Sequence, residues 1–115
     1  MTALERIDRI RHGEYIVARV NVAANILSAR AQDQGWGDIL DILRGMIPSE
    51  KPSRLFFSFD VEKIRANEAY VATIEFISEV VAMLESDMAS DAIVEFLQSI
   101  VKQGNILFYV GAECI

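Results

Sequence analysis

The chain has 115 residues, of which 52% are hydrophobic, and it carries 17 acidic against 11 basic side chains for a net charge of −6. This length favours one domain, 1–115, with a single hydrophobic core. The only cysteine, Cys114, excludes an internal disulfide bond, and the acidic balance argues against nucleic-acid binding because phosphates would be repelled.

Two long stretches contain few charges, 15–27 and 69–84. Neither reaches the roughly 18–20 uninterrupted apolar residues that a bilayer requires, so we expect buried helices and no membrane association. Residues 1–13 are charged throughout and lack the pattern of a secretion signal. Together with the single cysteine, this favours a cytoplasmic location.

The N-terminal segment predicts a long helix that ends near Ala31. Thr2 followed by Glu5 forms a capping box ahead of an apolar run. A polar stripe that includes Asn21 and Asn25 runs along this otherwise apolar helix. These amides either fix the register between helices or line a ligand pocket.

A turn at 33–37, which contains two glycines, precedes a short second helix at 38–46 that Pro48 ends. Apolar residues gather on one side of this helix: Ile39, Leu40, Ile42, Leu43 and Met46. A connector at 48–53 follows, and the aromatic run 55–59 then predicts a short strand.

A third helix is predicted over 61–85, with Asp60 as its cap. Its polar side is narrow, so we expect it to be the most buried element. A fourth helix is predicted from Ser90 to about Lys102, with its end at Gly104.

The apolar run 106–110 predicts a second strand, which would pair with 55–59. An isolated strand pair is marginal in water, so helices would have to cover it. The alternative is that both segments are helix extensions or coil packed on the bundle.

An internal repeat is suggested by residues 7–47, which align with 61–101 without a gap and with eight identities in 41 positions. Amphipathic helices also align by shared periodicity alone, which is the alternative. The repeat interpretation predicts a mainly α four-helix bundle of two pseudo-repeated helical hairpins, 3–47 and 60–103, in antiparallel contact, with a short two-stranded β pair as an optional addition. Repeat 1 would cover about 3–59 and repeat 2 about 60–110. Because helices that are apolar on most sides need cover from several directions, we also expect a homodimer.

Three carboxylates, Glu68, Glu75 and Glu79, share one side of the third predicted helix. If these carboxylates face outward, they would bind a partner. Residues 61–115 carry all of the net negative charge, so a basic protein is the partner we expect. Clustered inside, they would hold a cation. The remaining alternative pairs them with arginines of the first repeat, at Arg11, Arg19 and Arg30.

For a pocket between the repeats, the candidate lining residues are Asn21, Asn25, Tyr70 and Phe76. His12 lacks companions at metal-ligand spacing, and Cys114 lacks a partner that would make it a nucleophile. The sequence contains no glycine-rich phosphate motif and no Gly-x-Ser-x-Gly elbow. We therefore predict no catalytic residue, no metal ligand and no cofactor.

Three functions remain as hypotheses. The first is an acidic interaction protein, such as an inhibitor, an antitoxin-like neutraliser or an adaptor, that binds a basic protein partner. The second is a small-molecule binding module with an apolar pocket between the helical repeats. The third is a metal-dependent hydrolase that uses the three glutamates.

Overall fold

The structure, a computed structural model, describes residues 2–52, 60–86 and 88–113, with 3, 4 and 105–113 described by their backbone only. Over these residues the chain forms four helices: α1 (Ala3–Ala31), α2 (Trp36–Met46), α3 (Val61–Glu85) and α4 (Ser90–Glu113). The prediction of a mainly α fold with four helices is confirmed. Within the described ranges, no helix has a stretch long and apolar enough to pass through a bilayer.

The helix ends follow the local side-chain chemistry. The Thr2 hydroxyl accepts a hydrogen bond from the Glu5 backbone N–H at 3.2 Å, and the Asp60 carboxylate accepts one from the Glu62 N–H at 3.0 Å. Both bonds satisfy donors that the first turn of a helix leaves unpaired. In the turn after α1, the left-handed backbone position belongs to Asp33, with φ of 62°, and not to a glycine.

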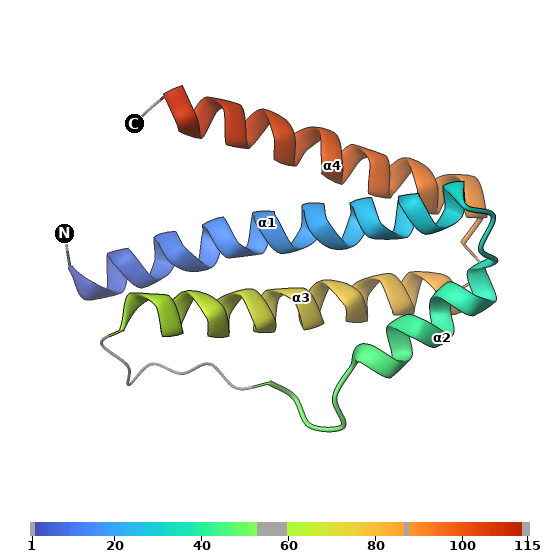
Figure 1. Ribbon diagram of the computed structural model, residues 1–115, viewed down its shortest axis with the longest axis horizontal. Coiled ribbons are helices and arrows are strands. Elements are labelled where there is room, and N and C mark those ends of the chain that lie inside the picture. The colour runs from blue at the N-terminus through green and yellow to red at the C-terminus, as the bar shows by residue number, and fades with distance from the viewer. Residues whose placement is uncertain (1, 53–59, 87, 114–115) are drawn as a thin grey trace.

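Helices α1 and α3 lie side by side and run in the same direction (Figure 1). Helix α4 packs on α1 and runs antiparallel to it, while α2 packs mainly on α3. The predicted hairpins, 3–47 and 60–103, are therefore not two closed units in antiparallel contact. Helix α2 leads the chain back toward the end where α1 begins, so α3 starts beside the start of α1 and runs parallel to it (Figure 1).

The core lies where α1, α2 and the first half of α4 cover α3. Its largest fully buried side chains are Phe76, Ile77, Val80 and Leu97. Helix α3 contributes nine buried residues, more than any other helix over the described side chains, as its narrow polar side indicated, while α1 lies between α3 and α4 (Figure 1). The aromatic rings of Phe76 and Phe96 are stacked with their centroids 6.5 Å apart, which ties α4 to α3 at the side-chain level.

The prediction of a strand at 106–110 is wrong, because this segment belongs to α4. Its predicted partner, 55–59, lies outside the described residues, and the elements that are described include no strand. The β pair is thus not confirmed, and for 106–110 the alternative of a helix extension holds. The internal repeat stays a prediction: α1 and α3 have similar lengths of 29 and 25 residues, whereas α2 and α4 differ, with 11 and 24.

Helix α4 does not end at Gly104, because this glycine lies in the contact between α4 and α1 and not in a turn. Gly104 is buried, and a Cβ placed on it would overlap the Cγ2 methyl of Val20 on α1. The missing side chain allows the two helix backbones to approach closely at this position.

Gly104→Ala is therefore expected to destabilise the fold, although alanine is the better helix former by about 1 kcal/mol. The added methyl group overpacks the α1–α4 contact, which typically costs about 1–3 kcal/mol. Urea denaturation followed by circular dichroism measures the change in the free energy of unfolding.

Gly13→Ala is the matched control, because α1 is continuous at Gly13 and nothing lies within 4 Å of an added Cβ. This change should stabilise the protein by about 1 kcal/mol. Val20→Ala combined with Gly104→Ala should recover part of the lost stability, because the smaller side chain leaves room for the methyl. If both glycine substitutions stabilised the protein equally, the close approach of α1 and α4 would be wrong.

Candidate functional site

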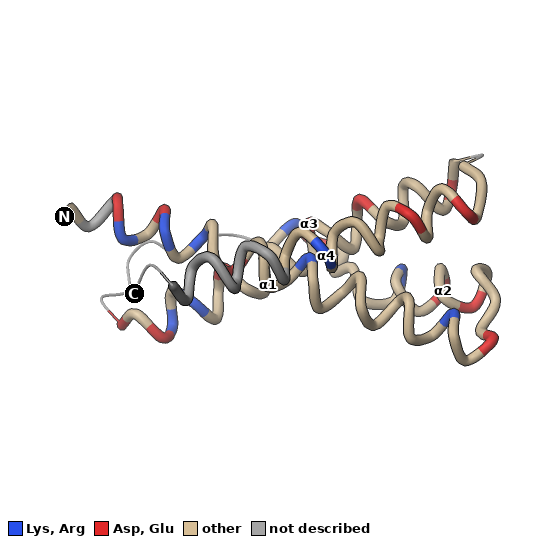
Figure 2. Tube along the Cα trace, turned by 90° about the horizontal axis from the view of Figure 1, so that it is seen from above, with Lys and Arg blue, Asp and Glu red and all other residues tan. Residues whose placement is uncertain are grey.

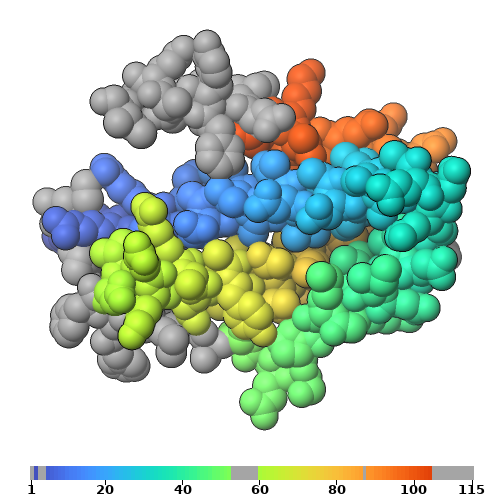
Figure 3. Space-filling model, in the orientation of Figure 1, coloured from blue at the N-terminus to red at the C-terminus, as the bar shows by residue number. Residues whose placement is uncertain are grey.

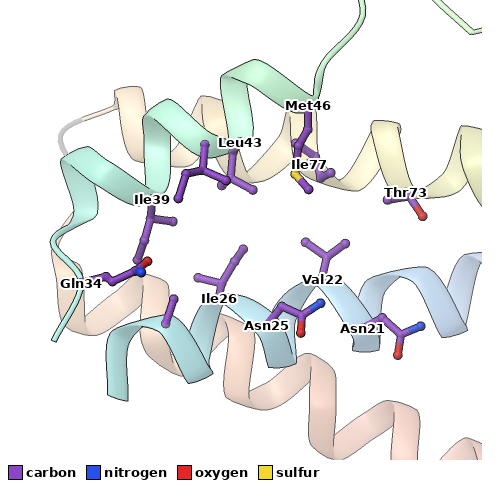
Figure 4. Close-up of a pocket in the computed structure, with 12 residues that line it drawn as sticks. Asn21, Val22, Asn25, Ile26, Gln34, Ile39, Leu43, Met46, Thr73 and Ile77 are labelled. Atoms are coloured by element: carbon purple, nitrogen blue, oxygen red, sulfur yellow. The ribbon is translucent and has the colours of Figure 1, made fainter. Parts of the chain in front are cut away.

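A groove of about 260 Å³ lies between α1, α2 and α3. Figure 4 shows α1 and α2 as its two walls, and Figure 3 views the face on which these helices reach the surface. The residues that line it are Asn21, Val22, Asn25, Ile26, Ala29, Gln34, Ile39, Ile42, Leu43, Met46, Thr73 and Ile77. Most are apolar and none is charged, so the groove suits an apolar and uncharged group.

The apolar lining has a buried floor and an exposed rim. Ile26, Ile39, Leu43 and Ile77 are at most 5% exposed and form part of the core. Ile42 and Met46 of α2, in contrast, are each 55% exposed. An occupant of the groove would cover both of these side chains and so remove apolar surface from water.

Polar side chains follow the opposite edge of the groove. Asn21 and Asn25 lie along α1 and are exposed, so their amides are open to water or to a ligand (Figure 4). The Thr73 hydroxyl on α3 donates to the Ala69 carbonyl at 2.7 Å, which fixes its proton within the helix. The groove therefore offers two amides on one edge and apolar side chains on the other.

Of the four residues predicted to line a pocket, the structure brings two to the groove. Asn21 and Asn25 line it. Tyr70 is 50% exposed and lies three residues before Thr73 on the same helix face, beyond the end of the groove. Phe76 is fully buried against Phe96 in the core, so it cannot contact a ligand.

The α2 wall is a candidate binding surface that the sequence alone does not reveal. In the sequence, Ile42 and Met46 belong only to the apolar side of a short predicted helix. The available signal was the width of that side, because five apolar residues in 39–46 cover more than the single stripe that a surface helix buries.

The three glutamates of α3 do not form one outward surface. Glu68 is only 3% exposed and accepts a hydrogen bond from Arg11 Nε at 3.2 Å, whereas Glu75 is half-buried and Glu79 is exposed. For Glu68, the predicted alternative of pairing with Arg11 is the one found. The sequence could place these residues on one helix side, but it could not show that α1 covers that side at Glu68.

The other two candidate arginines contact aromatic rings. The Arg19 guanidinium lies 5.1 Å from the Tyr15 ring centroid and 5.5 Å from that of Phe76. Arg30 lies 4.7 Å from the Trp36 ring centroid and donates to the Gln34 carbonyl at 2.9 Å. Both arrangements are cation–π contacts: that of Arg19 joins the middle of α1 to α3, and that of Arg30 lies at the turn between α1 and α2.

A second, polar cleft of about 320 Å³ lies beside the Arg11–Glu68 pair and also contains His12 and Tyr15. It contains no metal-binding set: across the described part of the chain, no three His, Cys, Asp or Glu side chains are grouped to hold an ion. The metal-dependent hydrolase that would use the three glutamates stays a hypothesis from the sequence. Cys114 lies outside the described residues.

Negative charge gathers at the end of the bundle where the α1–α2 and α3–α4 turns meet (Figure 2). The exposed carboxylates described there are Asp33, Asp38, Asp41, Glu85, Asp91 and Glu95. Arg44 binds Glu85 at 2.6 Å, and Arg30 is stacked on Trp36, so the two arginines at this end offset only part of the charge. The groove therefore opens beside an acidic surface.

No family model matches this chain, and no curated protein or solved structure matches it either. The function must therefore be inferred from the groove and its surroundings.

The buried ion pair leads to a stability prediction. Arg11→Met leaves the Glu68 carboxylate without its guanidinium partner, and we expect a loss of about 2 kcal/mol in the free energy of unfolding. Arg44→Met, which removes an exposed pair, should cost less than about 1 kcal/mol. Chemical denaturation measures both values.

The double substitution Arg11→Met with Glu68→Met should recover most of the stability, because no carboxylate then remains buried at this position. A double variant less stable than Arg11→Met would show that Glu68 is held mainly by groups other than Arg11.

Proposed function

We propose that this protein is a non-enzymatic interaction protein that takes up an apolar segment of a basic protein partner in the groove between α1, α2 and α3. The observation that carries the proposal is the half-exposed apolar rim formed by Ile42 and Met46. Full burial of such a side chain stabilises by about 1.5–3 kcal/mol, so covering the exposed part of each contributes about 1 kcal/mol.

The charge of the chain supports a basic partner. The net charge is −6, and the exposed carboxylates at the turn end lie next to the groove. A field of this sign accelerates the approach of a basic protein and disfavours an acidic one. We therefore propose α2 as the partner site in place of the three glutamates of α3. Of these glutamates, Glu68 is buried and only Glu79 is exposed.

A small apolar molecule is the second candidate, because the groove lining is mostly apolar. The groove volume of about 260 Å³ lies just below the roughly 300–1,000 Å³ of ligand pockets, so the ligand would have to be small. The amides of Asn21 and Asn25 would orient such a molecule through hydrogen bonds.

The homodimer and the cytoplasmic location remain predictions from the sequence. Neither is required for binding in the groove. The internal repeat is likewise a proposal, and it concerns the evolutionary origin of the chain. The groove is formed by α1 and α2 of the first proposed repeat and by α3 of the second.

Met46→Lys is expected to abolish capture of the partner, because it places an ammonium group on the apolar rim and repels a basic protein. Affinity capture from a lysate of the source organism at about 50 mM salt, with quantitative mass spectrometry, measures the retained proteins. The wild-type chain should enrich a basic protein that Met46→Lys does not retain.

Val61→Lys is the matched control, since Val61 is also exposed, at 53%, and the net charge changes equally. Val61 is the first residue of α3 and lies away from the groove-lining residues and from the acidic turn end. If both variants lost the same partner, overall charge would explain the capture and the groove would not be the site.

The small-molecule candidate has its own test. The neutral apolar dye Nile red should fluoresce on binding to the wild-type groove, and Leu43→Trp, which fills the groove, should reduce the signal severalfold. Equal fluorescence in the two proteins would place the dye elsewhere and remove this candidate's support.

A further inference from the structure

We propose that the segment taken up by the groove is a single amphipathic α-helix with cationic residues on one flank and neutral polar residues on the other. This inference rests on the proposed function and names the chemistry of the partner. It depends on three features: the nature of the groove walls, the length of the groove and the difference between its two edges.

The groove walls favour an occupant whose backbone N–H and C=O groups are hydrogen-bonded to one another. Apart from Gln34 in the turn, all described lining residues belong to helices. Helix backbones already use their N–H and C=O groups, so the groove offers no strand edge to an extended peptide. An extended segment would leave its own backbone groups unpaired against apolar side chains, whereas a helix pairs them itself.

The length fits a few turns of helix. The lining residues of α1 span 21–29, and those of α2 span 39–46. At 1.5 Å per residue these walls are about 12 Å and 10 Å long, which is close to two helical turns. An occupant would therefore insert three or four apolar side chains spaced three and four residues apart.

The two edges differ in charge. On α2, Asp38 lies one helical turn before Ile42 on the same side, and it is exposed. Asp33 adjoins Gln34 at the end of the groove. On α1, the edge is formed by Asn21 and Asn25 and carries no charge over the groove. Cationic side chains of the occupant are therefore attracted only when they lie on the flank that faces α2.

A second copy of this chain is a poorer occupant, because two chains of charge −6 repel each other. An acidic or purely hydrocarbon segment gains nothing from Asp38. Charge complementarity thus favours a basic amphipathic helix over both.

The probe is a labelled peptide of about 15 residues, near the shortest length at which a helix holds in water. It has leucines three and four residues apart, lysines along one flank and glutamines elsewhere. Fluorescence anisotropy at about 50 mM salt measures its Kd for the wild-type protein and for variants. The wild-type protein should bind it, and Asp38→Lys should weaken binding about five- to tenfold.

Glu62→Lys is the matched control, because Glu62 is, like Asp38, an exposed carboxylate in the first turn of its helix, it lies outside the groove lining and the acidic turn end, and the charge change is identical. It should change the Kd less than twofold. A peptide with glutamates in place of lysines should prefer Asp38→Lys to the wild-type protein, which would show that the flank faces this position. At about 1 M salt the difference between the variants should vanish.

The outcomes separate the two proposals. Equal weakening by Asp38→Lys and Glu62→Lys would overturn the one-sided flank but leave binding in the groove intact. Absence of peptide binding, with capture of a basic partner still dependent on Met46, would overturn the helix alone. Peptide binding that Met46→Lys does not affect would overturn the proposed function as well. A dimer in sedimentation that Met46→Lys dissociates would assign the groove to a second copy and overturn the helix.

Discussion

The parallel contact between α1 and α3 is the interaction on which the rest of the structure depends. Parallel helices place like ends of their dipoles side by side, so this contact needs a compensating gain. Both helices bury small residues, Ala18 and Ala23 on α1 and Ala72 on α3, and Phe76 and Val80 of α3 are fully buried. The Arg11–Glu68 pair adds a specific bond near the start of both helices and fixes their register.

The groove is a consequence of this arrangement and of the shortness of α2. Helix α1 has 29 residues, or about 44 Å, whereas α2 has 11 residues, or about 16 Å. Ile39 and Leu43 anchor α2 in the core, but α2 diverges from α1 along its length (Figure 1). The apolar surfaces of the two helices therefore meet at one end only, and the space between them stays open beside α3.

Local signals in the sequence were sufficient for α1, α2 and α3 and for the caps of α1 and α3, but not for the length of α4. Thr2, Asp60 and Pro48 each act through the adjacent backbone, so their roles can be predicted without knowing the fold. The parallel direction of α1 and α3 was not predictable in this way, because it depends on the direction in which α2 leads the chain. Gly104 illustrates the difference: the sequence marks it as a helix stop, and only the position of Val20 on α1 reveals that it is a contact. The candidate site divides similarly, since the polar character of Asn25 within an apolar helix was visible, whereas the burial of Glu68 and the exposure of Met46 depend on neighbouring helices.

The two edges of the groove together restrict what can bind there. An occupant that covered Asn21 and Asn25 with hydrocarbon would strip water from two amides, and each unsatisfied amide costs about 1–3 kcal/mol. Covering Ile42 and Met46 contributes only about 1 kcal/mol each, so a purely apolar ligand that also covers both amides gains little. A helix with hydrogen-bonding side chains opposite the amides avoids this cost and keeps the apolar gain. The two asparagines therefore disfavour the binding of simple hydrocarbons. Asp38 on the other edge favours an occupant with positive charge on the adjacent flank.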